Sequence, residues 1–364
     1  MRASHAMLRS TPVSARSRPI STRSNSQRKL GRNGPVVSSI GYGCMGISEF
    51  YGKTIPREEA VKLIRSAFKD HGVTFFDTAD MYGKGLSEEI LGEAVAPFRK
   101  DVVIASKCGI NRKDEGVAGG IEMANSPEYI KRACERSLRN LKMDQIDLYY
   151  LHRYDPVVPI ETSMNAMKEL IAEGKIRYVG LSEVSSEVIR RAHAVLGEKL
   201  VAVQTEYSFQ TRAPAEAVLP TCRELGISFV AYSPVARGLL TGAYRDPSFF
   251  GREGVYDIRT DALPRFQAGN IERNLRLTDA IKSIADRKGV TPAQLSLAWL
   301  LAQGKDIIPI PGTSNPKHLK ENMEAAAVVL SPDDLTAMEA AYNNNPVAGM
   351  RYAEAVFQVF KMQG

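Results

Sequence analysis

Short apolar segments alternate with amphipathic segments from about residue 30 to residue 345. The apolar segments are rich in β-branched and aromatic residues, which favours buried β-strands. The amphipathic segments repeat apolar residues every three or four positions, as Ala60, Ile64 and Phe68 do, which predicts helices with one buried face. The predicted strands cover eight ranges: 39–45, 73–80, 102–108, 147–153, 178–183, 201–208, 228–238 and 306–314.

A helix is predicted after each of these strands except the seventh, which is followed by a long excursion, residues 241–270. Two further helices are predicted between the seventh and eighth strands, over residues 274–289 and 291–304. Alternating strands and helices are typical of parallel βαβ units, and eight such units predict an α/β fold closed into a (β/α)8 TIM barrel. A doubly wound sheet is the alternative, but no G-x-G-x-x-G opens a helix after the first strand. A turn at residues 31–34 predicts a β-hairpin before the barrel.

The predicted barrel spans residues 29–345 and is followed by a C-terminal extension, residues 346–364. Residues 1–28 contain six arginines and no acidic residue, so we expect a disordered basic tail. The same composition is typical of an organelle transit peptide. That interpretation predicts a mitochondrial or plastid protein; a start placed too early, or a plain tail, predicts a cytoplasmic one.

The formal net charge is +7, and subtracting the six arginines of residues 1–28 leaves +1. The rest of the chain is thus close to neutral and lacks the excess of positive charge that is typical of nucleic-acid-binding proteins. No apolar run approaches the roughly 18 residues that span a bilayer. The four cysteines, Cys44, Cys108, Cys134 and Cys222, have neither C-x-x-C nor zinc spacing, so we expect buried thiols in a reducing compartment and no metal site.

Polar residues follow several of the predicted strands, and in (β/α)8 barrels the active site lies at these C-terminal strand ends. Asp77 ends the second strand, Lys107 the third and His152 the fourth. Tyr82 follows Asp77 by five residues in a glycine-rich loop. Each of these residues, taken alone, could simply make a structural contact or be solvated. Their shared position at the C-terminal ends of the strands is what indicates a site.

These four residue types suit the reduction of a carbonyl group. A buried lysine next to an aspartate stays charged. That cation is expected to lower the pKa of a neighbouring tyrosine toward neutrality, so that the tyrosine can exchange a proton with a carbonyl oxygen. A neutral histidine can hold the same oxygen through a hydrogen bond. The hydride for such a reduction has to come from a cofactor.

Seven motifs, in this order and at these strands, resemble the aldo-keto reductase family: FDTADMYG, ASKCG, DLYYLHR, YVGLSE, QTEYS, AYSPVARGLLTG and PIPGTSNPKHLKEN. GYGCMGISEFYG and PRFQAGN resemble the branch with pyridoxal reductases and their plant and bacterial relatives. The resemblance covers about residues 29–345. It implies an NADPH-dependent oxidoreductase that reduces aldehydes or ketones to alcohols, with pyridoxal as a candidate substrate.

The resemblance also implies roles for single residues. Tyr82 would be the general acid, Lys107 and Asp77 would tune it, and His152 would orient the carbonyl. Tyr232 would stack on the nicotinamide. Further cofactor contacts are implied for Met45, Ser182, Gln204, Ser233, Val235, Gly238, Gly312, Thr313, Ser314, Lys317, Glu321 and Asn322.

Within that set the resemblance separates the parts of the cofactor. Ser182 and Gln204 would hold the carboxamide, and the backbone of residues 233–238 the pyrophosphate. Residues 312–317 would hold the 2′-phosphate, since they precede a helix N-terminus, and Glu321 and Asn322 the adenine. Two departures stand out: Glu183 replaces an asparagine common in the family, and Ser314 replaces a common basic residue. NADPH is still favoured over NADH, because Lys317 and His318 supply positive charge.

The substrate pocket is expected near Phe50 and Tyr51, with loops 111–125 and 245–270 as further walls. Aromatic walls suit aliphatic or aromatic aldehydes, although such residues can also simply pack the barrel mouth. A second function class is an NADPH-binding regulatory subunit that resembles the potassium-channel β subunits. The sequence has no signature of the physiological substrate, the reaction direction or the oligomeric state.

Overall fold

The computed structural model describes residues 27–112, 120–245 and 256–360. Eight strands form one sheet in which every neighbouring pair is parallel and follows the order of the chain. The strands are β3 (Tyr42–Gly43), β4 (Phe75–Asp77), β5 (Val103–Cys108), β8 (Ile146–Leu151), β9 (Ile176–Ser182), β10 (Leu200–Glu206), β11 (Ser228–Tyr232) and β12 (Ile307–Pro309). All eight lie within the predicted ranges, except that β8 and β10 each begin one residue earlier and β9 begins two residues earlier.

Backbone hydrogen bonds join the first and last strands and close the barrel. The Gly41 amide donates to the Pro309 carbonyl at 2.9 Å, and the Gly43 amide to the Pro311 carbonyl at 3.3 Å. The two chains are so close here that a Cβ on Gly43 would lie 2.8 Å from the Ile310 carbonyl oxygen, and one on Gly312 would lie 2.6 Å from the Gly43 carbonyl oxygen. The predicted (β/α)8 barrel is therefore confirmed, and its seam requires glycine.

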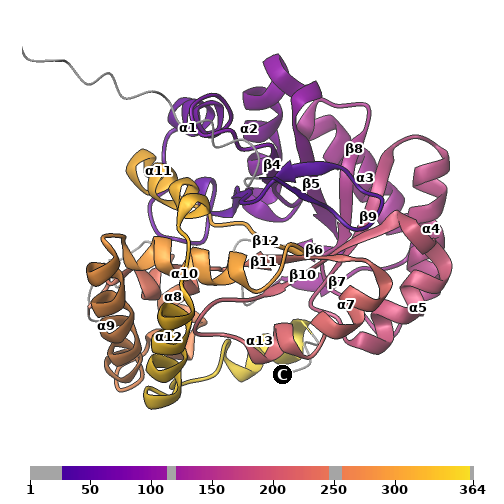
Figure 1. Ribbon diagram of the computed structural model, residues 1–364. Helices are drawn as coiled ribbons and strands as arrows, with labels where there is room; N and C mark the ends of the chain where they lie inside the picture. Colours follow the sequence, from indigo (N-terminus) through magenta and orange to yellow (C-terminus); the bar gives the residue numbers. More distant parts are fainter. Residues whose placement is uncertain (1–26, 113–119, 246–255, 361–364) are drawn as a thin grey trace, which may run out of the picture.

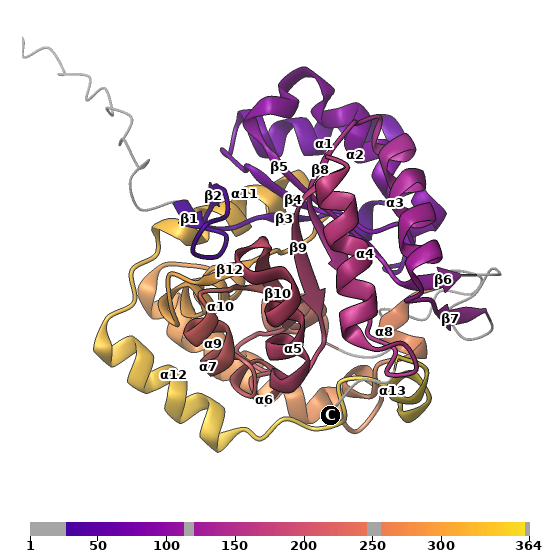
Figure 2. The same ribbon diagram turned by 90° about the vertical axis from the view of Figure 1, so that its right-hand side faces the viewer.

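Helices surround the barrel (Figures 1 and 2). They are α1 (Arg57–Lys69), α2 (Leu86–Val95), α3 (Pro127–Leu141), α4 (Ile160–Ala172), α5 (Ser186–Leu196), α6 (Ala213–Glu216), α7 (Leu219–Leu225), α9 (Ile271–Lys288), α10 (Pro292–Ala302) and α11 (Pro316–Glu324). One helix is expected after the strand β10, but this part of the chain forms two, α6 and α7. Pro220 explains the break, because it has no N–H to donate to the carbonyl of Glu216.

The predicted N-terminal hairpin pairs β1 (Gln27–Lys29) with β2 (Val36–Ser38). It begins two residues before the expected start of the barrel domain. The Arg28 guanidinium fastens it to the barrel by donating to the carbonyls of Leu301 at 2.8 Å and Gly304 at 2.5 Å. The expected tail or transit peptide otherwise lies outside the described residues.

The remaining elements lie at or near the C-terminal ends of the strands or follow the barrel. They are the hairpin of β6 (Ile110–Arg112) and β7 (Ile121–Met123), the short α8 (Ile258–Asp261), α12 (Pro332–Asn344) and α13 (Glu354–Phe360). After α12 the chain crosses back to the barrel (Figure 2), where the Ala353 amide, just before α13, donates to the Ala262 carbonyl at the end of α8. The C-terminal extension thus returns to the end of the barrel where a site is expected.

The barrel interior is a packed core of apolar side chains that include Phe75, Leu148 and Ile308. The site must therefore lie above this core and not within a channel. All four cysteines are buried free thiols, as predicted. Within the described ranges, no helix combines the length and the apolar character needed to cross a membrane.

Candidate active site

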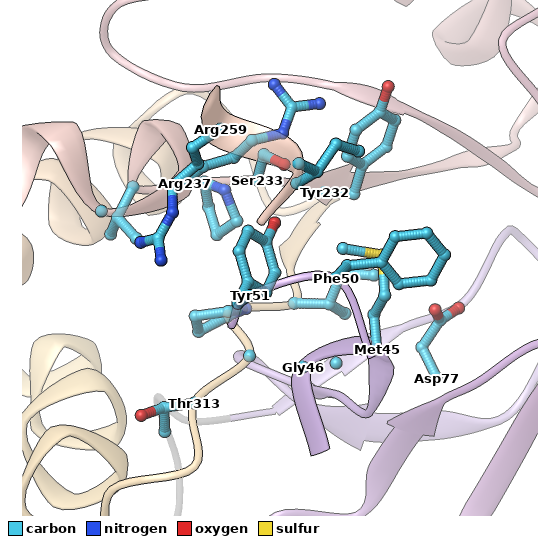
Figure 3. A pocket seen from close by; sticks show the side chains of 18 of the residues that line it. Met45, Gly46, Phe50, Tyr51, Asp77, Tyr232, Ser233, Arg237, Arg259 and Thr313 are labelled. Carbon is cyan, nitrogen blue, oxygen red and sulfur yellow. The ribbon is translucent and has the colours of Figure 1, made fainter. Parts of the chain in front are cut away.

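A cavity of about 550 Å³ opens at the C-terminal ends of the strands. Fifteen of the seventeen predicted site residues line it, and Lys107 and Lys317 do not. In Figure 3, Arg237 and Arg259 lie on one side of the cavity and Asp77 on the other, and Phe50 and Tyr51 lie between them. Its lining includes Tyr82 and His152 near the strand ends and Asn322 on α11.

Lys107 lies behind the cavity wall, with its side chain fully buried. Its Nζ donates to the Asp77 carboxylate, to the Thr78 carbonyl at 2.8 Å and to the Tyr82 hydroxyl at 3.5 Å. The parallel register of β4 and β5 brings the ends of these strands together and so allows this contact. Gln204 donates to the second Asp77 oxygen at 2.7 Å, which fixes the carboxylate.

The Lys107 ammonium keeps its charge in this dry environment. Burial alone would lower the pKa of Lys107, but the Asp77 carboxylate and the Tyr82 phenol outweigh burial and raise it above its ordinary value. Since Lys107 does not line the cavity, it can act on a ligand only through Tyr82.

Tyr82 is presented by a tight turn in which Gly83, Lys84 and Gly85 all have positive φ. The predicted lowering of its pKa is wrong. Burial raises the pKa of Tyr82 above its ordinary value, and Lys107 offsets only part of this rise because its charge is shared with Asp77. Tyr82 is therefore a protonated phenol at neutral pH, which suits a proton donor.

His152 lies beside this phenol, with the two rings edge to face and their centroids 5.9 Å apart. Burial lowers the pKa of His152 well below its ordinary value, and the charges of Arg153 and Lys107 lower it further. The imidazole is therefore neutral. Its Nδ1 is buried without a hydrogen-bond partner among the described residues.

Asp80 is a buried carboxylate two residues before Tyr82, which the sequence did not single out as a titrating group. Its backbone amide donates to the Lys107 carbonyl at 3.3 Å, and its Oδ2 accepts from Arg136 at 2.8 Å. Burial raises the pKa of Asp80 to about 7, and the Glu88 carboxylate adds to the rise, although Arg136 opposes it. The charge of Asp80, in the loop that carries Tyr82, therefore changes near neutral pH.

We expect the stability of the protein to fall as the pH rises from about 4 to about 7. The folded state binds the Asp80 proton more tightly than the unfolded chain, whose aspartates titrate near pH 3.9, so this contribution is complete below pH 4 and is lost as the pH passes 7. The shift corresponds to about 4 kcal/mol. Urea unfolding of wild type and Asp80→Asn at several pH values measures it; parallel curves for the two proteins would contradict the assignment.

The residues expected at the nicotinamide carboxamide are already engaged with their neighbours. Ser182 Oγ accepts from Arg153 at 3.0 Å, and the Gln204 amide nitrogen is committed to Asp77. Asp77 thus takes one of the two amide N–H groups of Gln204. The Tyr232 hydroxyl donates to Glu183 at 2.9 Å.

The loop after β11 winds through four left-handed residues, Ser233, Ala236, Arg237 and Gly238. Ser233, Val235 and Gly238 line the cavity as predicted. The Gly238 amide, however, already donates to the Val235 carbonyl at 3.0 Å, so in this conformation it does not point at a phosphate. Sequence reasoning missed Arg237, which lines the cavity and lies 3.3 Å from Glu206.

At the far end, α11 begins next to the cavity. Its N-cap Asn315 accepts from the Lys317 amide at 2.9 Å, and the Tyr42 hydroxyl holds the preceding loop through the Thr313 carbonyl at 2.5 Å. The Lys317 side chain is exposed and does not line the cavity. His318 lines it instead.

The other predicted residues at this end, Gly312, Thr313, Ser314, Glu321 and Asn322, all line the cavity, and so does Met45 near the catalytic cluster. Two long loops meet over the cavity: Tyr51 pairs with Asp257, and the Ile258 amide donates to the Phe50 carbonyl at 2.9 Å. Phe50 and Tyr51 line it as expected, and so do Ile110 and Ile258. Residues 113–119 and 246–255 of the expected loops lie outside the described part of the chain.

Across the described residues, no three His, Cys, Asp or Glu side chains group closely enough to hold a metal ion.

The chain matches the family model described as "Aldo/keto reductase family" over residues 39–343. It is 43% identical over 330 residues to a probable aldo-keto reductase of Glycine max, with 89% of this chain and 91% of that protein covered. It is 44% identical to an NADP(+) aldo-keto reductase of Schizosaccharomyces pombe, over 89% of this chain and 94% of that protein.

Solved structures with the same fold include a glycerol dehydrogenase from Gluconobacter oxydans (TM-score 0.78, 26% identity, 90% of this chain and 98% of that one). Another is an aldo-keto reductase from Klebsiella pneumoniae in complex with NADPH (TM-score 0.66, 28% identity, 90% of this chain and 98% of that one).

Proposed function

The chain belongs to the aldo/keto reductase family, and from this premise we propose that it reduces aldehydes or ketones to alcohols with NADPH. The observation that carries the proposal is the contact of the buried Lys107 ammonium with both Asp77 and Tyr82 at the end of a large cavity. That contact couples a proton donor to a fixed positive charge.

The cavity suits NADPH on two grounds. Its lining includes residues of the catalytic cluster and residues of α11, whose N-terminus favours a phosphate. Arg237 adds positive charge along its wall.

NADPH, when bound, supplies the hydride. The chain's own residues handle the oxygen of the substrate. Tyr82 donates its hydroxyl proton to that oxygen, and Lys107 stabilises the phenolate that remains. Asp77 keeps Lys107 charged and in place, while the neutral His152 donates a hydrogen bond that orients the carbonyl. Solvent then returns the proton to Tyr82.

The cavity wall next to Tyr82 favours apolar substrates. Phe50 packs edge to face on Tyr82 at 6.0 Å between centroids, and Met81, Ile110 and Ile258 also line the cavity. We therefore propose aliphatic and aromatic aldehydes as the substrate class, with pyridoxal as the member to test first.

We expect the protein to oxidise NADPH when 4-nitrobenzaldehyde or pyridoxal is added, with a kcat/KM at least about tenfold above that with NADH. Charge-assisted hydrogen bonds to the 2′-phosphate account for a difference of this size. The absorbance of the reduced cofactor measures both rates. Equal rates with the two cofactors would contradict the proposed phosphate contacts at α11.

A regulatory subunit similar to the potassium-channel β subunits stays an alternative prediction. It would bind NADPH tightly, turn over none of the carbonyl compounds in the panel and hold a protein partner. The same assay, combined with a direct measurement of NADPH binding, separates this outcome from catalysis.

A further inference from the structure

The C-terminal strap, residues 346–353, contributes Tyr352 to the cavity wall, next to Tyr232 and Arg237. Arg351 is only 6% exposed, and its NH1 and NH2 groups donate to the two carboxylate oxygens of Glu183, each at 3.0 Å. The next residue, Tyr352, lines the cavity, and its hydroxyl lies 3.2 Å from that of Tyr232. It also accepts a hydrogen bond from Arg237 at 2.5 Å.

The strap is held in this position at several points. Asn274 pairs with Ala348 in both directions, donating to its carbonyl at 2.9 Å and accepting from its amide at 2.8 Å. Arg265 donates to the Gly349 carbonyl at 3.3 Å. The Ala353 amide donates to the Ala262 carbonyl at 3.0 Å. Arg351 and Tyr352 are thus carried by a backbone that the barrel anchors on both sides of them.

Glu183 follows β9 directly and has a left-handed φ of 53°, which sets its side chain apart from that of Ser182. Its Oε1 accepts from the Glu206 amide at 3.0 Å and from Tyr232, in addition to Arg351. Burial would raise the pKa of Glu183, but the charge and hydrogen bonds of Arg351, together with the Arg153 charge and the Glu206 amide, outweigh burial and lower it. The carboxylate is ionised and saturated with donors.

Tyr232 is therefore fixed by two partners. Glu183 accepts from its hydroxyl at 2.9 Å, and the Tyr352 hydroxyl lies on its other side. Arg351 in turn fixes Glu183, and a second carboxylate, Glu206, lies 3.7 Å from the guanidinium. The chain of contacts runs from the C-terminal strap, through Glu183, to the aromatic ring that walls the cavity.

We propose that Arg351 and Tyr352 are positioning residues for the nicotinamide end of the cofactor. They hold Glu183 away from the carboxamide and keep the ring of Tyr232 flat against the cofactor. The inference rests on the proposed function, since it takes NADPH as the ligand. The proposal gives the C-terminal extension a role in the site. Its residues Arg351 and Tyr352 are more than a hundred positions away in sequence from Glu183 and Tyr232, which they position.

The test compares two ligands that share the adenosine 2′-phosphate but differ in the nicotinamide. We expect Arg351→Met to raise the Kd for NADPH at least about tenfold, because a bidentate charged contact is lost. The Kd for adenosine 2′,5′-bisphosphate should stay within about twofold, since that ligand does not reach Tyr232. Tyr352→Phe should move NADPH affinity in the same direction by less. Calorimetry measures each of these dissociation constants for the variants and for wild type.

Two further variants separate positioning from folding. Arg351→Lys keeps the charge and should recover part of the NADPH affinity. Met350→Ala replaces a neighbouring residue that is 50% exposed, and it should leave the Kd of both ligands unchanged. Equal losses for both ligands, or NADPH affinity unchanged in Arg351→Met, overturn the proposal. Failure of wild type to bind NADPH would instead reject the proposed function, so the two failures are distinct.

Discussion

Tyr82→Phe should lower kcat for aldehyde reduction by about 10²- to 10⁴-fold, the usual contribution of a general acid. The substitution removes a single oxygen, the one that Lys107 contacts at 3.5 Å, and leaves the ring to pack against Phe50 and His152. The Kd for NADPH should therefore stay within about twofold. Steady-state kinetics and a binding titration together show whether the loss falls on the chemical step.

Tyr178→Phe is the matched control, because the Tyr178 hydroxyl donates to the Asn33 carbonyl at 3.2 Å, away from the cavity. It should keep the wild-type kcat. If Tyr82→Phe turns over at the wild-type rate, the proton comes from another group, and the role of Lys107 and Asp77 has to be reassigned with it.

The strand-end argument placed the catalytic cluster correctly because a parallel barrel repeats one simple geometry. Strands that follow each other in the chain are neighbours in the sheet, so Asp77, Lys107 and His152 had to meet once the eight units were recognised. The pKa of Tyr82 could not be obtained the same way. Its direction depends on how deeply the phenol is buried and on how Lys107 divides its charge, and both are three-dimensional properties.

The contacts that sequence reasoning missed join parts of the chain that are far apart. Arg351 and Glu183 are separated by 168 positions, and no periodic pattern or motif connects them. The place of Lys317 depends on another three-dimensional property. A motif identifies the helix that faces the cofactor, but the rotation of that helix decides that His318 and Asn322 face the cavity and Lys317 does not.

Lys107→Met should lower the free energy of unfolding by about 3–5 kcal/mol and abolish measurable turnover. The methionine fills much of the same volume but leaves the Asp77 carboxylate buried beside only Gln204, and breaking a buried ion pair costs this much. Urea unfolding measures the first effect and kcat the second. Arg57→Met, which removes an exposed pairing with Glu89 and Glu93, is the control and should cost about 1 kcal/mol or less.

The double variant Asp77→Asn/Lys107→Met separates the two effects. With neither charge present, no buried ion is left unpaired, so most of the lost stability should return. Turnover should not return, because the phenolate of Tyr82 would still lack the cation that stabilises it. A double variant that recovered both would mean that the pair serves folding alone. Recovery of stability without activity would assign the buried charge of Lys107 to the chemistry of Tyr82.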